Sequence, residues 1–108
     1  MDIFIEEGGP DFTIELDTFW AVHAGADPIT VFKRCPRRVP VIHVKDKEVI
    51  KNEPVMCQIG EGNLNWDGII AAAKKAGTKW YAVEQDTCRR DPFDCLRSSY
   101  EFLTSKGL

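Results

Sequence analysis

The run Val39-Pro40-Val41-Ile42-His43-Val44-Lys45 lies near the middle of the chain and predicts a short β-strand that is apolar on both sides of its alternation. Strands of this kind are typical of parallel sheets that are buried on both faces. Two further strands are predicted on either side of it, over Phe12–Trp20, which is rich in β-branched and aromatic residues, and over Lys79–Glu84. The chain is therefore expected to contain a parallel sheet.

Three helices are predicted from their start and stop signals. Asp27 and Asp91 are each followed by proline, which is the pattern of an N-cap with proline at the first helical position, and Asn65 caps a helix between them. The first helix is expected to end before Pro36 and the second at Gly77. Strands that alternate with helices in this way predict βαβ units, and hence an α/β fold.

The helices that follow Asn65 and Asp91 are expected to pack on the sheet through apolar residues at helical spacing. These residues are Trp66, Ile69, Ile70, Ala73 and Ala76 in the first of the two, and Phe93, Leu96, Tyr100 and Leu103 in the second. Trp80 is expected to pack between helix and strand as well. The segment before Gly8 is compatible with the tail of another helix, and residues 46–64 are interpreted as a polar loop.

The length of the chain limits how much of a barrel it can form. A (β/α)8 barrel uses about 31 residues for each βα unit, so 108 residues hold roughly three and a half units. Three parallel strands are few for a closed domain. We therefore predict a partial TIM barrel of three βα units, with residues 1–108 as a single partial-barrel domain.

The composition excludes several classes of protein. The chain has 44% hydrophobic and 29% charged residues, the balance of an ordinary soluble protein, and no apolar run that approaches a membrane span or a signal peptide. Its net charge of −3 argues against a nucleic-acid partner. The four cysteines contain no C-x₂-C pair, so we expect small apolar thiols in a reducing cytoplasm rather than a structural zinc site.

Polar side chains stand at the end of each predicted strand, namely Asp17, His43 with Lys45, and Glu84. Because the carboxyl ends of parallel strands meet at one edge of the sheet, these side chains are expected to converge. Two carboxylates and one imidazole suit a divalent cation such as Mn²⁺, Mg²⁺ or Co²⁺. Other roles remain open, because Asp17 can be a helix cap, His43 can be a hydrogen-bonded core residue, and Lys45 and Asp46 can be solvated.

Five motifs resemble the sugar phosphate isomerase/epimerase family, whose members are xylose-isomerase-like TIM barrels. The matching segments cover nearly the whole chain in the order of the family's last three βα units, and they are Glu15-Leu16-Asp17-Thr18-Phe19-Trp20, Ala24-Gly25-Ala26-Asp27-Pro28, Arg38-Val39-Pro40-Val41-Ile42-His43-Val44-Lys45-Asp46, Ile59-Gly60-Glu61-Gly62-Asn63-Leu64-Asn65-Trp66 and Val83-Glu84-Gln85-Asp86.

The resemblance implies that Asp17, His43 and Glu84 bind a divalent metal, Mn²⁺, Mg²⁺ or Co²⁺, with zinc also possible. The family has a fourth ligand, a Glu from an earlier strand, that nothing in this chain matches. In its epimerases the two glutamates move a proton beside a metal-polarised carbonyl through an enediolate, which makes Glu84 the catalytic candidate. Trp20 stands where some ketose epimerases have a substrate-contacting His, and Trp20, His23 and Lys45 are the candidate contacts to a sugar or sugar phosphate.

Two other functions remain open at this level. A truncated chain can be a non-catalytic assembly module, and endonucleases of the abasic-site type share the barrel, although they use many histidines and this chain has two. Three strands leave two unpaired sheet edges, so we expect either a homo-oligomer or an N-terminal part of the barrel as the partner.

Overall fold

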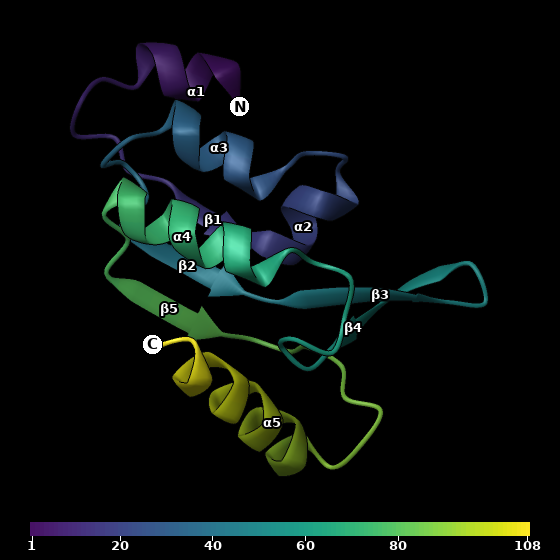
Figure 1. The fold of residues 1–108 in the computed structure, drawn as a ribbon. Coiled ribbons are helices and arrows are strands. Elements are labelled where there is room, and N and C mark those ends of the chain that lie inside the picture. Colours follow the sequence, from purple (N-terminus) through teal and green to yellow (C-terminus); the bar gives the residue numbers. More distant parts are fainter.

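The structure is a computed structural model that describes all 108 residues, and its centre is a parallel sheet. The sheet contains β1 (Glu15–Asp17), β2 (Val41–Val44) and β5 (Trp80–Val83) in the order β1-β2-β5 (Figure 1). His43 of β2 is in register with Asp17 on one side and Ala82 on the other. The predicted α/β class and the three-stranded parallel sheet are therefore confirmed.

Five helices accompany the strands, namely α1 (Asp2–Glu7), α2 (Thr18–His23), α3 (Pro28–Arg34), α4 (Trp66–Ala76) and α5 (Pro92–Ser105). The predicted caps are present. The Asp27 carboxylate accepts the Ile29 and Thr30 N–H groups, and Asn65 and Asp91 make the equivalent bonds at α4 and α5. Gly77 ends α4 with a φ of 83°, a left-handed conformation that favours glycine. None of these helices is long and apolar enough to cross a membrane.

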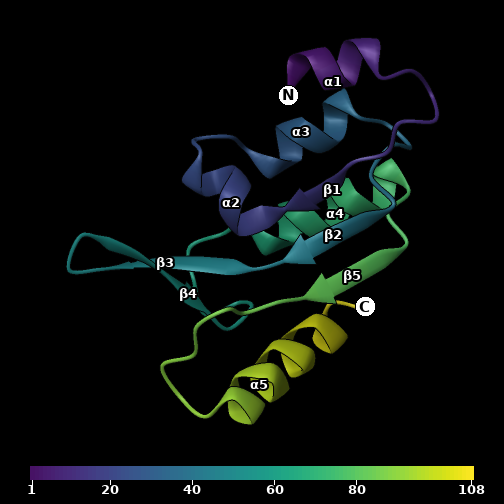
Figure 2. The ribbon, with the colours of Figure 1, turned by 180° about the vertical axis from the view of Figure 1, so that it is seen from behind.

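The two faces of the sheet differ in character. Helix α4 lies over β1 and β2 on one face, and the view from behind shows the strands uncovered (Figures 1 and 2). Leu16, Ile42 and Val44 point to the covered face and belong to the buried core. The alternation of each strand sends Asp17 and His43 to the other face. The prediction that the strands are apolar on both faces is therefore wrong for β1 and at His43 of β2, whereas β5 has the apolar residues Trp80 and Ala82 on its uncovered face.

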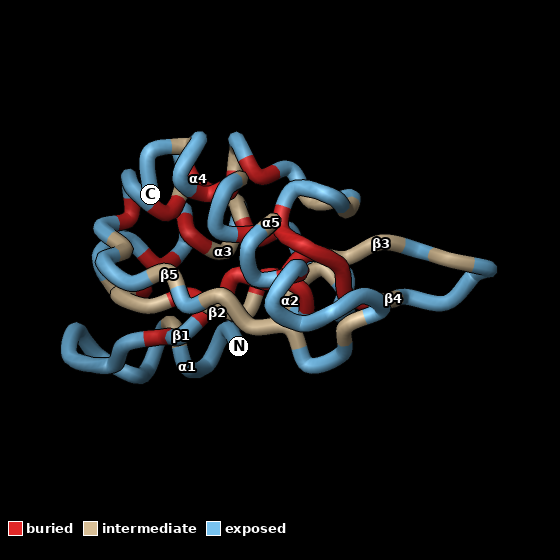
Figure 3. Tube along the Cα trace, turned by 90° about the horizontal axis from the view of Figure 1, so that it is seen from below, coloured by how far each residue is buried: buried red, intermediate tan, exposed pale blue.

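The burial pattern agrees with this layering. Seen from below, the helices α3, α4 and α5 lie on the same side of the strands, and buried segments run between the two layers (Figure 3). On β5, Tyr81 and Val83 pack against the core, whereas Trp80 is 69% exposed. The expected packing role of Trp80 is therefore wrong, since the residue lies on the uncovered face.

The strand expected over Phe12–Trp20 is much shorter in the structure. It ends at Asp17, because the Asp17 side chain accepts the Trp20 N–H at 3.0 Å and so starts helix α2. Aromatic and β-branched composition favoured a longer strand, but one side-chain cap at its end is enough to turn the chain into a helix.

The segment expected to be a polar loop contains a β-hairpin. Strands β3 (Asp46–Ile50) and β4 (Glu53–Cys57) pair antiparallel and project beyond the sheet (Figure 1). Both turn residues, Lys51 and Asn52, have positive φ angles of 51° and 68°, which is the geometry of a two-residue type I′ turn. The turn lacks the glycine that usually marks it in a sequence, and this explains why it was missed.

Helix α5 buries a different face from the one predicted. Its buried residues are Cys95, Ser99 and Leu103, and the Ser99 hydroxyl accepts the Ile59 N–H at 3.1 Å. Phe93 and Tyr100 are 76% and 69% exposed, so the expected apolar face is wrong except for Leu103. The helix packs on the segment that follows the hairpin, and this long-range contact outweighs the local apolar pattern.

Candidate metal centre

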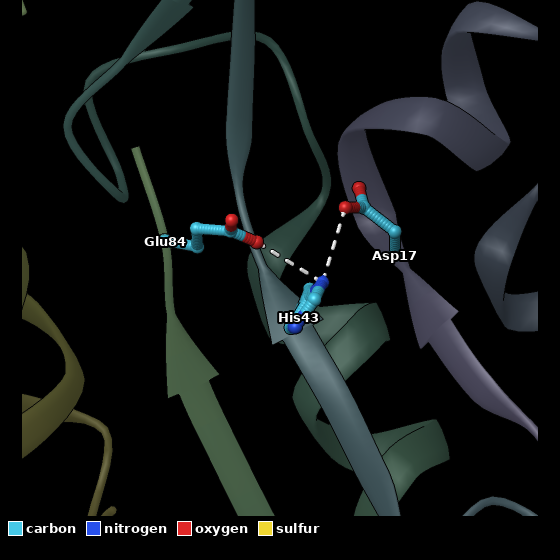
Figure 4. A group of neighbouring side chains, drawn as sticks. All are labelled: Asp17, His43 and Glu84. Atoms are coloured by element: carbon cyan, nitrogen blue, oxygen red, sulfur yellow. Dashed lines mark ion pairs between the residues drawn. The ribbon is translucent and has the colours of Figure 1, made fainter. Parts of the chain in front are cut away.

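Three strand-end side chains meet on the uncovered face of the sheet. Asp17 ends β1, His43 lies in β2, and Glu84 follows β5 (Figure 4). One ligand-type atom from each of the three lies within 4.8 Å of the other two. The convergence expected from parallel strand ends is therefore observed, and His43 does not point to the helix-covered face.

Asp17 has two roles at once. One carboxylate oxygen, Oδ1, caps helix α2, while the other, Oδ2, lies 3.5 Å from His43 Nδ1. The cap and ligand interpretations of Asp17 were alternatives in the sequence, but the two oxygens of one carboxylate satisfy both. The cap also holds the carboxylate in place, because Oδ1 is tied to the backbone of the first turn.

His43 presents its two ring nitrogens to different carboxylates. Nδ1 lies 3.1 Å from Glu84 Oε2 and 3.5 Å from Asp17 Oδ2, whereas Nε2 lies 3.1 Å from Glu15 Oε1. Glu15 was not among the predicted site residues. Its position two residues before Asp17 in the same strand places both side chains on one face, and this alternation was the signal that could have found it.

Lys45 is the cationic member of the cluster. Its Nζ lies 3.2 Å from Asp17 Oδ2, 3.0 Å from Glu84 Oε2 and 3.2 Å from Asp86 Oδ2, and its side chain is only 5% exposed. Burial alone would lower the pKa of Lys45, but the carboxylates of Glu84, Asp17 and Asp86 around its ammonium raise the pKa above its ordinary value. Lys45 is thus fully charged and buried, so the solvated alternative is wrong. Asp86 belongs to the polar run that follows the third strand in the sequence, but it was not among the predicted site residues.

A buried hydroxyl fixes the end of β2 beside the end of β1. Thr18 is completely buried, and its Oγ1 accepts the Lys45 N–H at 2.9 Å and donates to the Lys45 carbonyl oxygen at 2.7 Å. Because Thr18 directly follows Asp17, these bonds connect the backbones of two residues whose side chains meet in the cluster.

The donor set fits a divalent cation. Glu84 Oε2 is buried and has no hydrogen-bond partner of acceptable geometry, although it lies close to both His43 and Lys45. A buried carboxylate oxygen without a hydrogen bond is costly unless a cation compensates for it. Two carboxylates and an imidazole nitrogen are ligands that Mn²⁺, Co²⁺ and Zn²⁺ accept. In this structure the Lys45 ammonium provides the compensating charge.

The other predicted substrate contacts, Trp20 and His23, lie on α2, the helix that Asp17 caps. Trp20 is 50% exposed on α2, and its ring stands edge-on to those of Phe19 and His23 at centroid distances of 5.1 and 5.3 Å. His23 is exposed at the end of the same helix. Of the three predicted substrate contacts, only Lys45 contacts strand-end residues of the cluster, namely Asp17 and Glu84, and the roles of Trp20 and His23 remain predictions.

The comparisons with known proteins identify the architecture. No protein-family model and no curated protein matches the chain. Two crystal structures of sugar phosphate isomerase/epimerases from Parabacteroides distasonis ATCC 8503 match it with TM-scores of 0.68 and 0.69 at 28% and 26% identity, over 84% and 85% of this chain. A xylose isomerase domain protein from Planctomyces limnophilus shares the fold with a TM-score of 0.72 at 21% identity, over 94% of this chain.

The matches cover only part of each known structure. The chain spans 30% of the length of both Parabacteroides proteins and 40% of the Planctomyces protein. The resemblance inferred from the sequence motifs is thereby confirmed, and the fold is that of part of a xylose-isomerase-like barrel.

Proposed function

We propose that this chain is the metal-binding part of a sugar or sugar phosphate isomerase/epimerase. The observation that carries the proposal is the convergence of Asp17, His43 and Glu84 at the ends of three parallel strands, on the face that no helix covers. The similarity to the two Parabacteroides isomerase/epimerases supports the same class of reaction.

In this proposal the residues of the cluster provide metal binding, proton transfer and substrate binding. Asp17, His43 and Glu84 hold the divalent metal, which supplies a Lewis acid that polarises a substrate carbonyl. Glu84 also moves a proton at the neighbouring carbon, so that the substrate passes through an enediolate. Lys45 is charged and contacts Asp17 and Glu84, so we assign to it the binding of a hydroxyl or phosphate group of the substrate. Trp20 and His23, on the helix that Asp17 caps, are proposed as further substrate contacts.

The chain supplies three ligands and one acid/base carboxylate. Proton removal from one face and return to the other requires a second acid/base group, and in the family this group is the glutamate of an earlier strand that nothing in this chain matches. We therefore expect the 108-residue chain to bind metal without isomerising a sugar by itself.

Metal titration of a matched pair of variants tests the proposal. Asp17→Asn keeps the cap of α2, because Asn caps helices as well as Asp does, but it removes a ligand charge. Asp27→Asn makes the same change at the cap of α3, outside the cluster. We expect Asp17→Asn to weaken Mn²⁺ binding at least about tenfold in calorimetry and Asp27→Asn to leave it unchanged. Equal affinities in the two variants, or no Mn²⁺ binding by the unsubstituted chain, would contradict the proposal.

A further inference from the structure

A second row of side chains crosses the uncovered face of the sheet, next to the candidate metal centre. Glu15 precedes Asp17 by two residues in β1 and therefore lies on the same face. Its neighbours in this row are Val41 of β2 and Trp80 of β5, which are apolar. Glu15 is thus the one member of the row whose side chain can carry a charge or accept a hydrogen bond.

The Glu15 carboxylate reaches one ring nitrogen of His43. Its Oε1 lies 3.1 Å from His43 Nε2, which is within hydrogen-bond distance. The other ring nitrogen, Nδ1, faces Asp17 and Glu84, and the two dashed contacts in Figure 4 meet at it, with the second nitrogen on the far side of the ring. Glu15 therefore does not add a fourth ligand to the three strand-end atoms, and its contact with His43 needs another explanation.

The position of one proton decides whether His43 can bind a metal through Nδ1. A neutral imidazole carries one proton, and it binds a metal only through the nitrogen that keeps its lone pair. The oxygens of Asp17 and Glu84 beside Nδ1 attract the proton to that nitrogen, where it would block the lone pair. Glu15 is the carboxylate that attracts the proton to Nε2 instead.

The surroundings of His43 leave its ring dependent on such a partner. Main-chain pairing of β2 with β1 and β5 fixes the backbone of His43. Its side chain is 35% exposed, so packing alone does not hold the ring. The Glu15 carboxylate makes no other ion pair or side-chain hydrogen bond, and it is therefore available to His43.

We propose that Glu15 is a positioning residue of the metal centre, whose carboxylate accepts the Nε2 proton of His43 and leaves Nδ1 free to bind the cation. This role rests on the proposed function for the metal itself, but the state of the His43 ring can be measured in the metal-free chain. A carboxylate that binds the second nitrogen of a metal-binding histidine generally orients the ring and fixes its tautomer.

Nitrogen-15 NMR of the metal-free chain tests the tautomer. The chain has two histidines, so His23 is an internal reference. At alkaline pH, where an ordinary imidazole is neutral, we expect the proton of His43 on Nε2. Glu15→Leu should shift this proton towards Nδ1, whereas Glu15→Gln should keep it on Nε2, because the amide oxygen still accepts it. A proton on Nδ1 in the unsubstituted chain, or an unchanged tautomer in Glu15→Leu, would overturn the proposal.

Calorimetry with Mn²⁺ on the same variants measures the consequence for the metal. We expect Glu15→Leu to weaken Mn²⁺ binding at least about tenfold, the usual effect of losing the outer partner of a metal-binding histidine. Glu15→Gln keeps the acceptor and loses only the charge, so it should bind Mn²⁺ clearly more tightly than Glu15→Leu. Equal losses in the two variants would show that Glu15 acts through its charge alone and would overturn the positioning role.

Controls separate this role from folding and from the proposed function. Glu101→Leu, at an exposed position on α5, should leave the tautomer and the Mn²⁺ affinity unchanged. The Glu15 side chain is 53% exposed, so the circular dichroism melt of Glu15→Leu should match that of the unsubstituted chain, whose own tautomer decides the proposal if it does not. A chain that holds the proton on Nε2 but binds no Mn²⁺ would refute the proposed function and leave the control of the tautomer by Glu15 standing. Equal Mn²⁺ affinity in all variants would refute the role of Glu15 alone.

Discussion

A single buried lysine dominates the electrostatics of the candidate site. The ammonium of Lys45 contacts Asp17 Oδ2 and Glu84 Oε2, the same oxygens that face His43 Nδ1. Lys45 therefore balances the two carboxylates in the absence of another cation. A divalent metal that binds these two oxygens must displace the Lys45 ammonium or bind beside it. Lys45 and the metal therefore compete for the same carboxylate oxygens.

Lys45→Met is expected to strengthen metal binding. The substitution removes a positive charge about 3 Å from two ligand oxygens and leaves a side chain of similar length, so the repulsion that a divalent ion meets is reduced by several kcal/mol before solvent screening. We expect the Mn²⁺ affinity measured by calorimetry to rise at least about tenfold. Lys47→Met, a change two residues further along in which no ion pair is lost, is the control. Weaker binding by Lys45→Met would mean that the lysine supports the site instead.

Asp46, the neighbour of Lys45, is a structural carboxylate. It is 1% exposed and accepts N–H groups from Gly60, Gly62 and Trp66 at 2.7–3.0 Å, besides those of Lys47 and Leu64. The sequence left open that Asp46 is solvated, and this is wrong. The carboxylate closes the loop that runs from the hairpin to α4.

Asp46→Asn is expected to destabilise the chain. The asparagine side chain has an NH₂ group in place of one carboxylate oxygen, and this group cannot accept hydrogen bonds. Buried N–H groups that now donate to Asp46 would lose their acceptor, which lowers the free energy of unfolding by about 3 kcal/mol. Urea denaturation should show a midpoint lowered by the corresponding amount with an unchanged slope. Asp11→Asn, at an exposed position with no side-chain partner, should change the free energy of unfolding by less than about 0.5 kcal/mol. A similarly small change for Asp46→Asn would show that the loop does not depend on the carboxylate.

At the scale of the elements, local capping signals determine where the helices begin. Asp27, Asn65 and Asp91 were identified from the sequence, and each caps its helix in the structure. A cap at Asp17 was one of the roles left open, but the strand-type composition of the residues after it favoured a longer strand. At Asp17 the side-chain cap, and not the composition, decides the structure.

The cap of α3 is expected to make stability depend on pH in the acid range. The Thr30 hydroxyl and the N–H groups of the first turn hold the pKa of Asp27 below its ordinary value. As the pH falls, the unfolded chain therefore binds a proton at Asp27 before the folded chain does. The stabilisation is complete above the unfolded pKa of about 3.9 and is lost as the pH falls through the lower folded pKa.

Asp27→Asn removes this dependence while it keeps the cap. We expect a loss of about 0.5 kcal/mol at pH 7, where the charged carboxylate favours the helix N-terminus, and a shallower fall of the urea midpoint between pH 5 and pH 3. Asp11→Asn provides the reference, since that carboxylate caps nothing. If the urea midpoints of Asp27→Asn and of the unsubstituted chain fell equally with pH, this role of Asp27 would be contradicted.

At the scale of the molecule, the parallel sheet has two edges that no strand pairs with. β1 and β5 are the outer strands, so each has one free edge. The uncovered face of the sheet carries the charged cluster around His43 and also exposes Trp80 of β5. Apolar side chains are also exposed beside β5, where Leu96 and Tyr100 of α5 line, together with the half-buried Tyr81, a groove of about 540 Å³.

We predict that the chain forms a dimer through this β5 and α5 edge, because unpaired strand groups beside an apolar groove favour association with a second copy. Sedimentation at micromolar concentration should show twice the mass of one chain. Leu96→Lys places a charge in the groove and should give a monomer, whereas Glu101→Lys, at an exposed position on the same helix, should remain a dimer. A monomeric unsubstituted chain with a cooperative melt would refute the prediction.

The sequence alone determined the features that depend on neighbouring residues. Caps, prolines and the 3.6-residue period gave the starts and ends of α3, α4 and α5, and the alternation of strands and helices predicted a parallel sheet. The parallel sheet in turn predicted that Asp17, His43 and Glu84 lie close together, because parallel strands end at the same edge of a sheet.

Only the tertiary structure decided what depends on partners distant in the chain. The buried face of α5 is set by its contact with the segment after the hairpin, and Lys45 is buried because three carboxylates from other segments surround its ammonium. The same holds for Asp46, whose donors lie up to 20 residues away. A charged side chain is stable in the interior only when such partners compensate for its lost hydration, and no local pattern in the sequence shows whether they are present.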